Sequence, residues 1–434
     1  MAYYRVKGAQ TLKGEITVST AKNSAVSFLC ASTMIEGKVT LKDVPRIQEV
    51  ERILELIQSI GVRYVWIDEH TLELDSSGKL DMEKIDKAAC RRTRSSLLLL
   101  GALAARVKTF KLYKSGGCKL GQRTVRPHTY ALEKFGVQVE SKRYYYDVHN
   151  KPLVAADIVM YESGDTPTEN AVLAAVFASG TTTIHFASAN YMVQDLCCFL
   201  KHLGARIEGI GTTTLTITGV TQLKSGQTYH IMPDPIDAMA WIAVAATTKS
   251  SLTIKNAPLD FLRLEMEKLK VMGQTFTLSK ARKSKNGHFD IVDITMKPSS
   301  LTALPDKLSC RPYPGLNIDN LPLFIPILTQ AKGRTLVHDW VYDNRAIYAL
   351  ELQQLGGNVT LVDTHRIYVE GVSRLQANDL MCPPALRPAM TVLICMLAAN
   401  GTSILRDPYQ IERGYERVVE RLRAVGADIE RIDD

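Results

Sequence analysis

The sequence lacks long apolar runs, zinc-type cysteine patterns and a stripe of alternating basic and aromatic residues. No stretch among its 434 residues approaches the roughly 18 consecutive apolar residues that a membrane-spanning helix needs. The N-terminal residues also carry no apolar core of a secretory signal peptide. These absences argue against a membrane protein, and we expect a cytoplasmic one.

Cysteine is present but scattered. None of the eight cysteines forms a Cys-x-x-Cys pair or lies at zinc-ligand spacing from a histidine, so we predict no metal site. Most of them lie in apolar segments, where cysteine behaves as a small buried hydrophobic residue. Cys118 differs because it alone lies among glycines and cations.

Basic residues outnumber acidic ones, which favours anionic partners. The chain has 53 Lys and Arg against 45 Asp and Glu, a formal net charge of +8, but the cations are spread over its whole length. Aromatic residues make up only 7% of the sequence, and no basic and aromatic stripe of a nucleic-acid-binding module is present. The charge therefore predicts small phosphorylated ligands and not a nucleic acid.

A glycine-rich basic segment surrounds Cys118. It contains three glycines and four cations: Gly116, Gly117, Gly121, Lys114, Lys119, Arg123 and Arg126. Glycines let a backbone change conformation at little cost, and nearby cations favour a thiolate over a thiol. The composition suits a loop that closes over an anion. An ordinary solvated surface loop with an incidental cysteine is the alternative that composition leaves open.

An internal repeat organises the whole chain. Six times, at intervals of roughly 70 residues, an amphipathic helical pattern ends at a glycine and a β-like run follows, which is the signature of a repeated structural unit. These glycines are Gly61, Gly136, Gly204, Gly273, Gly356 and Gly426. Each unit also contains a helix of small residues that runs through a turn into a strand rich in Thr, Ile and Val.

The repeat predicts an α/β fold built from two inside-out α/β barrel domains. Residues 95–105 and 389–399 are apolar around nearly the whole helix circumference, so we expect helices buried inside and strands outside. Six units divide into two sets of three βαβαββ-type units. Residues 228–235 are rich in turn formers and mark the boundary. We expect one domain at residues 22–229 and a second at residues 1–21 with 230–434.

Five motifs carry a family resemblance. They are residues 20–25 (TAKNSA), 115–123 (SGGCKLGQR), 312–319 (PYPGLNID), 343–345 (DNR) and 411–417 (IERGYER). Together they resemble the UDP-N-acetylglucosamine enolpyruvyl transferases of peptidoglycan synthesis, from about residue 3 to residue 432, with the repeat in phase. The sister family, 5-enolpyruvylshikimate-3-phosphate synthase, looks less similar because it lacks the cysteine segment.

The resemblance implies a reaction and its catalytic groups. An acceptor hydroxyl adds to C2 of phosphoenolpyruvate, and phosphate then leaves, without a metal or organic cofactor. By motif position, Cys118 is similar to the family's general acid and reactive thiol, and Asp319 to the carboxylate near the acceptor hydroxyl. Lys22, Arg123 and Arg387 match the residues that bind the phosphate of phosphoenolpyruvate. Without the resemblance, Asp319 would be read as a turn residue.

Other residues match substrate contacts of the family. The expected contacts are Asn23, Arg94, Arg126, Asp165, Thr166, Tyr342 and Arg345. His128 keeps its family position, where we expect an orienting group. The implied partners are phosphoenolpyruvate and a nucleotide-type acceptor, with no nucleic acid, no membrane and no obligate protein partner.

Three departures concern the acceptor. Arg126 replaces an acid that would accept a hydrogen bond from uracil, and Asp165 adds a carboxylate where a diphosphate would lie. Residues 190–195 also differ from the family's Glu-Pro-Glu pattern. Three hypotheses follow: a divergent transferase acting on UDP-N-acetylglucosamine, a transferase acting on another hydroxyl such as that of a uridine nucleotide, or a non-catalytic paralogue.

Overall fold

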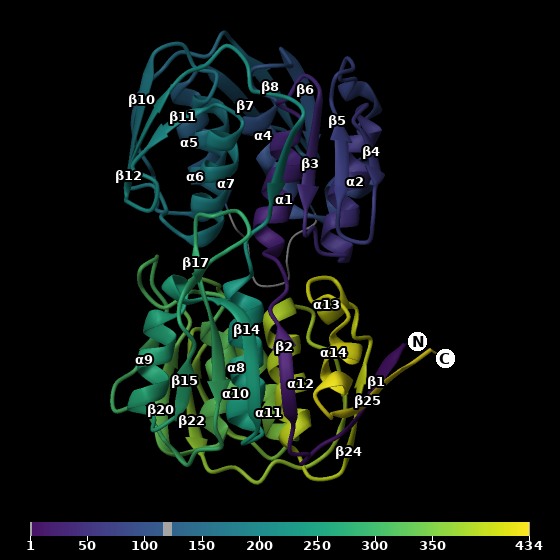
Figure 1. Cartoon of the computed structure of the whole chain (residues 1–434), viewed down its shortest axis with the longest axis vertical. Helices are drawn as coiled ribbons and strands as arrows, with labels where there is room; N and C mark the ends of the chain where they lie inside the picture. The colour runs from purple at the N-terminus through teal and green to yellow at the C-terminus, as the bar shows by residue number, and fades with distance from the viewer. Residues whose placement is uncertain (1, 116–123, 434) are drawn as a thin grey trace. The chain divides into compact units, whose positions relative to one another are not determined.

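The computed structural model describes residues 2–115 and 124–433. Within these residues, contacts divide the chain into two compact units: unit 1, residues 2–19 and 233–433, and unit 2, residues 20–115 and 124–232. Figure 1 shows the purple N-terminal strand β2 (Lys13–Thr17) beside β14 (Ser251–Pro258), with which it pairs in parallel. The N-terminal segment therefore completes the unit formed by the C-terminal half of the chain.

The described part of unit 1 contains three sheets, two of which carry an extra short strand. In spatial order, the first consists of β23 (Asp379–Met381), β24 (Thr402–Arg406), β1 (Tyr3–Lys7) and β25 (Asp428–Ile432). The second consists of β15 (Phe276–Leu278), β17 (Asp290–Met296), β14 and β2, with β16 (Arg282–Lys283) on β17. The third consists of β18 (Leu301–Thr302), β20 (Ala331–His338), β22 (Arg366–Gly371) and β21 (Asn358–Asp363), with β19 (Leu308–Ser309) on β20.

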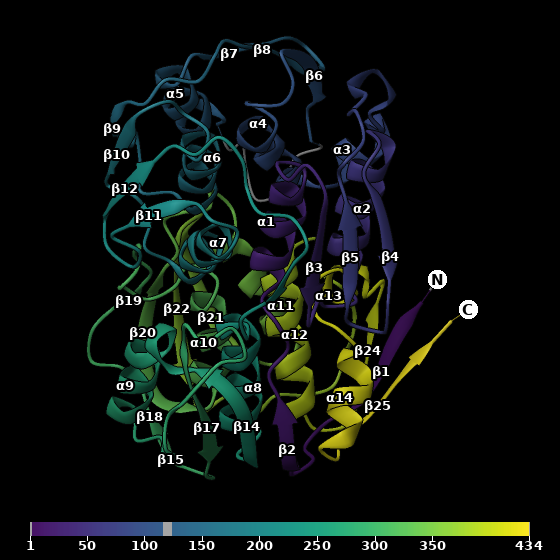
Figure 2. The same ribbon diagram turned by 45° about the horizontal axis from the view of Figure 1, so that its top comes forward.

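Three apolar helices form the core of unit 1. They are α8 (Pro235–Thr247), α10 (Leu321–Thr329) and α12 (Leu386–Ala398), and each contacts the other two. Every residue of α8 and α10, and every residue of α12 except the last, is buried, as expected for helices that are apolar all round. Figure 2 shows them among the strands of the unit. The remaining helical segments are η3 (Leu259–Phe261), α9 (Arg263–Val271), η4 (Ala346–Leu350), α11 (Glu351–Gln354), α13 (Tyr409–Glu412) and α14 (Val418–Ala424).

Unit 2 also contains three sheets in its described residues. In spatial order, the first consists of β11 (Arg206–Glu208), β12 (Thr214–Thr218), β10 (Thr181–His185) and β9 (Asp157–Val159). The second consists of β13 (Gln227–His230), β3 (Lys38–Lys42), β5 (Leu72–Asp75) and β4 (Arg63–Trp66). The third consists of β6 (Thr109–Tyr113), β8 (Tyr145–Asn150) and β7 (Val137–Ser141). Its helical segments are α1 (Lys22–Ser32), α2 (Gln48–Ser59), η1 (Met82–Lys84), α3 (Lys87–Arg92), η2 (Arg94–Leu98), α4 (Leu99–Ala102), α5 (Arg126–Lys134), α6 (Asp165–Ala175) and α7 (Tyr191–His202). Of these, α1, α4 and α6 are buried along almost their whole length.

The predicted glycine helix ends are confirmed. Gly61, Gly136, Gly204, Gly273, Gly356 and Gly426 follow α2, α5, α7, α9, α11 and α14, and their φ angles lie between 79° and 109°. A residue with a Cβ is strained in this region, whereas glycine is not. Each of the six repeated patterns in the sequence therefore corresponds to a helix that ends at a glycine with a positive φ angle.

The class prediction of mixed α/β structure is confirmed, with one local difference. Residues 95–105 do not form a continuous α-helix: the segment starts as η2, capped by the Thr93 hydroxyl on the amide of Ser95, and only α4 is α-helical. All described cysteines except Cys382 are buried, as predicted. No helix within the described residues is both long and apolar enough to cross a membrane.

Candidate functional site

One group of candidate residues lies in unit 1 and begins at a loop before α10. The amide of Asp319 donates to Oδ1 of Asn317 at 2.8 Å, which folds the loop on itself. Oε1 of Glu265, on α9, accepts from the amide of Asn317 at 3.3 Å and from Nδ2 of Asn320 at 2.8 Å. Burial raises the pKa of Glu265, and the hydrogen bond from Asn320 opposes that rise. Glu265 therefore anchors the loop on both sides of Asp319.

Asp319 lies between two arginine side chains from different segments. Nη2 of Arg387, on α12, lies 3.2 Å from its Oδ2 atom, and Nη1 of Arg345, just before η4, lies 3.5 Å from its Oδ1 atom. The arginine side chains are 7% and 2% exposed, whereas that of Asp319 is 23% exposed. Contacts between charged groups are stronger where water is excluded. The arrangement fixes a partly accessible carboxylate between two buried cations.

Arg345 is itself held by a second carboxylate. Its Nε lies 2.5 Å from Oδ2 of Asp339, and its Nη2 donates to Oδ1 of Asp339 at 2.8 Å and to the carbonyl of Ile318 at 2.6 Å. Its guanidinium carbon lies 4.3 Å from the ring centroid of Tyr342. Burial lowers the pKa of Arg345, but the Asp339 carboxylate more than offsets this, and the net change is a rise. Arg345 therefore stays cationic.

Arg387 has a neutral partner as well. Its Nη1 donates to the hydroxyl oxygen of Tyr415 at 2.9 Å. Burial raises the pKa of Tyr415 to about 12, although the nearby Arg387 opposes that rise. Tyr415 is therefore a neutral phenol that accepts a hydrogen bond from Arg387.

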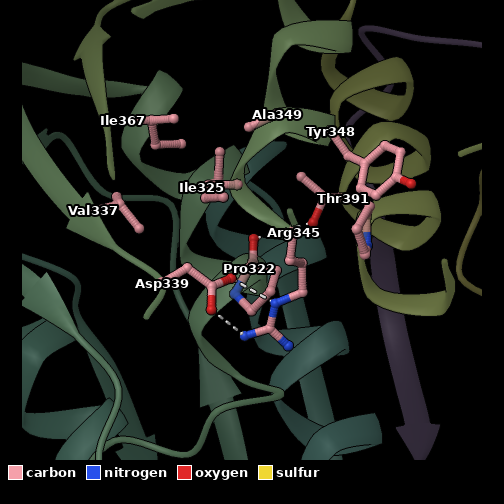
Figure 3. Close-up of a pocket in the computed structure, with 11 residues that line it drawn as sticks. Pro322, Ile325, Val337, Asp339, Arg345, Tyr348, Ala349, Ile367 and Thr391 are labelled. Carbon is pink, nitrogen blue, oxygen red and sulfur yellow. Dashed lines mark hydrogen bonds and ion pairs between the residues drawn. The ribbon is translucent and has the colours of Figure 1, made fainter. Parts of the chain in front are cut away.

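A small pocket lies against the Arg345–Asp339 pair. Figure 3 shows Asp339 and Arg345 pointing toward one another, with Ile325, Val337 and Ile367 on the apolar side of the pocket. Its free interior is about the size of a single water molecule. The pocket is therefore too small for a phosphorylated substrate, and the accessible face of Asp319 is the better candidate site.

In unit 2, Lys22 and Asn23 begin the buried helix α1. The preceding residue, Ala21, donates its amide to the carbonyl of Met232 at 2.8 Å, and Nδ2 of Asn23 donates to the hydroxyl of Tyr191 at 3.0 Å. A helix N-terminus carries a partial positive charge and unpaired amides, so it attracts anions. Lys22 adds a full positive charge at the first residue of this helix.

Arg94 and Arg126 both have partners within unit 2. Nη2 of Arg94 donates to the carbonyl of Thr124 at 3.1 Å. Nη1 of Arg126 donates to Oε1 of Glu133 at 2.8 Å, and its guanidinium carbon lies 5.6 Å from the ring centroid of Tyr130. Both members of the Arg126–Glu133 pair are exposed. Arg126 thus faces an acid on its own helix, α5.

Asp165 is the first residue of α6 and is held by two side chains. Oγ of Ser188 donates to its Oδ1 at 2.6 Å, and Nδ2 of Asn190 donates to its Oδ2 at 3.0 Å. A carboxylate is favoured at this end of a helix. One turn later, burial and the Asp165 charge raise the pKa of Glu169 well above its usual value. Thr166, between them in sequence, is half-buried.

The structure brings only some of the predicted residues together. Asp319, Arg345, Arg387 and Tyr342 form one group in unit 1. Residues of unit 2 lie at helix starts or before them: Lys22, Asn23, Arg94, Arg126, Asp165 and Thr166. Cys118 and Arg123 lie outside the described residues. His128 is buried, and its Nδ1 atom lies 2.8 Å from Nδ2 of Asn170, while its orienting role stays a prediction.

Sequence reasoning missed three residues of the unit 1 group. Tyr415 lies in the motif at residues 411–417 (IERGYER), but nothing in the sequence of that motif indicates that its tyrosine contacts Arg387. Asp339 follows a strand of Thr, Leu, Val and His, where an acidic residue at a strand end is a usable signal. Glu265 sits in an ordinary amphipathic helix, and nothing in the sequence pattern distinguishes it.

Comparisons with known proteins identify the family. The model of the family EPSP synthase (3-phosphoshikimate 1-carboxyvinyltransferase) matches residues 6–422. The UDP-N-acetylglucosamine 1-carboxyvinyltransferase of Bradyrhizobium diazoefficiens is 35% identical over 441 residues, covering 99% of this chain and 98% of that protein. The enzyme of the same name from Treponema denticola is 33% identical over 437 residues, covering 99% of each chain.

Solved structures share the fold. The enolpyruvyl transferase NikO from Streptomyces tendae superposes with a TM-score of 0.85 at 24% identity, covering 99% of this chain and 98% of that one. EPSP synthase from Acinetobacter baumannii superposes with a TM-score of 0.77 at 18% identity over the full length of both chains. The family match and the full-length relatives establish that the chain belongs to the EPSP synthase family of enolpyruvyl transferases.

Proposed function

We propose that this protein transfers the 1-carboxyvinyl group of phosphoenolpyruvate to a hydroxyl of UDP-N-acetylglucosamine and releases phosphate, a step in peptidoglycan precursor synthesis. Its full-length relatives at 31% to 35% identity bear that activity in their names. The observation that carries the proposal is the accessible carboxylate of Asp319, fixed between the buried guanidinium groups of Arg345 and Arg387. Such a group can accept a proton while adjacent cations stabilise a polyanionic substrate.

The reaction assigns a role to each catalytic residue. Asp319 accepts the proton of the acceptor hydroxyl while the hydroxyl oxygen bonds to C2 of phosphoenolpyruvate. Cys118 donates a proton to C3 of phosphoenolpyruvate, which gives a tetrahedral intermediate. Loss of the C3 proton then restores the double bond as the bond between C2 and the phosphate oxygen breaks. Lys22, Arg123 and Arg387 bind the phosphate group, because three cations offset the charge that accumulates on it.

The remaining contacts are assigned to substrate binding. We propose that Asn23, Arg94, Thr166, Tyr342 and Arg345 contact the substrates, and that no metal, organic cofactor or obligate protein partner takes part.

We also propose a cytoplasmic location, and two inside-out barrels of three βαβαββ-type units each, at residues 22–229 and at 1–21 with 230–434. The buried helices and the three described sheets in each unit support that architecture.

A second candidate is transfer to a different acceptor, such as a uridine nucleotide. Asp165 favours it, because a carboxylate about 4 Å from a diphosphate costs on the order of 1 to 4 kcal/mol, depending on the effective dielectric. Arg126 favours it as well, since it donates to Glu133 and presents no acceptor to a uracil ring.

An acceptor screen separates the candidates. The full chain is incubated with phosphoenolpyruvate and with UDP-N-acetylglucosamine, UMP or UDP, and released phosphate is measured. Phosphate release with UDP-N-acetylglucosamine supports the main proposal. Release with another nucleotide alone supports the second candidate. No release with any acceptor, from protein that binds phosphoenolpyruvate, supports a non-catalytic paralogue.

A further inference from the structure

Asp339 is a buried carboxylate to which the mechanism above gives no role. It follows β20 directly and is 4% exposed. Its amide donates to the carbonyl of His365 at 2.7 Å, and its own carbonyl lies 3.1 Å from Nδ1 of His365. These two contacts fix its backbone to the turn between β21 and β22, so its side chain starts from a rigid position.

The contacts of Asp339 determine where Arg345 can point. Both carboxylate oxygens bind the guanidinium, at 2.5 Å and 2.8 Å, which fixes its plane as well as its position. With Nε and Nη2 directed at Asp339, the Nη1 atom is the one that faces Asp319, at 3.5 Å. The longer distance indicates that Arg345 is shared unequally between its two carboxylates.

We propose that Asp339 is a positioning residue that acts through Arg345 to keep Asp319 basic, an inference that rests on the proposed role of Asp319 as proton acceptor. Asp339 draws the guanidinium toward itself and offsets part of its positive charge. Without the negative charge of Asp339, Arg345 would pair more closely with Asp319 and stabilise the ionised form of Asp319 more strongly. A carboxylate so stabilised has a lower pKa and is a weaker base.

Other charged and titratable groups also lie around Asp319. Arg387 approaches it from α12, and Tyr415 is reached through Arg387. Glu265 contacts the loop on both sides, through the Asn317 amide and the Asn320 side chain. None of the contacts given for these groups involves Asp339, so we expect a changed pH profile of the Asp339 variants to report the path through Arg345.

The test compares Asp339→Asn and Asp339→Glu with the unmodified protein. Asp339→Asn keeps the size of the side chain and removes its charge. We expect kcat to fall at least about tenfold, with KM for phosphoenolpyruvate changed less than about threefold. We also expect the acid side of the kcat profile to move about one pH unit lower, because the proton acceptor has become less basic.

Asp339→Glu keeps the charge but cannot reproduce the same two contacts in a buried site. We expect kcat to fall about threefold or more, with the acid side of the profile unmoved. The matched control is Asp290→Asn, which removes the carboxylate of an exposed pair with Lys283 in the same unit. That variant should keep the kcat and pH profile of the unmodified protein.

Two results would overturn the inference. One is a folded Asp339→Asn protein whose kcat and pH profile match those of the unmodified protein. The other, decisive if Asp339→Asn does not fold, is an Asp339→Glu protein with unchanged kcat. Failure of the proposed function is distinct, because the unmodified protein would then release no phosphate with any acceptor. If another acceptor is the substrate, the same variants are measured with it.

Discussion

Arg387 donates from Nη1 to the hydroxyl oxygen of Tyr415 at 2.9 Å, and its Nη2 atom lies 3.2 Å from Asp319. The phenol therefore holds one end of a guanidinium whose other end faces the candidate base. Because Tyr415 is buried and neutral, the contact orients Arg387 without cancelling its charge. Three side chains that are far apart in sequence thus form one rigid group.

Tyr415→Phe removes the acceptor and leaves a buried donor on Arg387. We expect the free energy of unfolding to fall by about 1 to 3 kcal/mol, and KM for phosphoenolpyruvate to rise because Arg387 is less well oriented. Urea unfolding and steady-state kinetics measure the two effects. Tyr144→Phe, at a residue 54% exposed, is the control and should change neither quantity. Equal effects of both substitutions would refute the orienting role.

Cys118 should be the most reactive thiol of the chain. Burial raises the pKa of the other cysteines: to about 12 for Cys90, Cys198 and Cys382, and to about 11 for Cys310. These thiols are therefore poor nucleophiles near neutral pH. Fosfomycin should label Cys118 first, as peptide mass spectrometry can establish. Labelling of Cys310 ahead of Cys118 would contradict the prediction.

Asp165 should weaken the binding of a nucleoside diphosphate sugar. Asp165→Val removes the carboxylate and releases Ser188 and Asn190, so we expect binding of UDP-N-acetylglucosamine to improve about tenfold, which equals about 1.4 kcal/mol. Calorimetric titration of both proteins is the measurement. Tight binding by the unmodified protein, or weaker binding by the variant, would show that Asp165 does not exclude the diphosphate.

Asp195 should make the stability of the protein depend on pH. Burial raises its pKa from 3.8 to about 7, against hydrogen bonds from the Met232 amide and the Tyr229 hydroxyl that lower it. The folded state therefore holds this proton between about pH 4 and 7 while the unfolded state has lost it, so the Asp195 contribution to stability falls as pH rises through that window.

Asp195→Asn removes this titration. The melting temperature of the variant, relative to that of the unmodified protein, should therefore be higher at pH 8 than at pH 5. A shift of about three pKa units corresponds to roughly 4 kcal/mol at most. Thermal unfolding across this pH range measures the difference. A difference that does not change with pH would mean that Asp195 is not protonated in the folded protein at pH 5.

The fold could be predicted largely from the sequence because its signals are local. Each of the six glycines has a positive φ angle. This angle is required by the local backbone at the helix end and does not depend on distant residues. The all-apolar pattern of α12 likewise predicts burial without knowledge of its neighbours. The prediction of an α-helix at residues 95–105 was wrong at its start, because the capping contact of Thr93 favours a 3-10 turn over a longer α-helix.

Residues of the candidate site could be predicted only where they match motifs or positions of the family. Asp319 and Arg345 lie in family motifs, and Arg387 matches a family position, but the contacts that order them depend on residues brought together by folding. Asp339 lies at a strand end, and Glu265 on a helix of another repeat. Their partners are set by tertiary packing, which no local pattern encodes.

The most direct test of the proposed reaction is mass spectrometric identification of its product. The unmodified protein and Asp319→Asn are incubated with phosphoenolpyruvate and UDP-N-acetylglucosamine, with Asp290→Asn as the control. We predict an enolpyruvyl ether of the nucleotide sugar from the unmodified protein and the control, and a rate lower by about 10²- to 10⁴-fold for Asp319→Asn. Absence of that ether from folded, unmodified protein, or an undiminished rate for Asp319→Asn, would contradict the account.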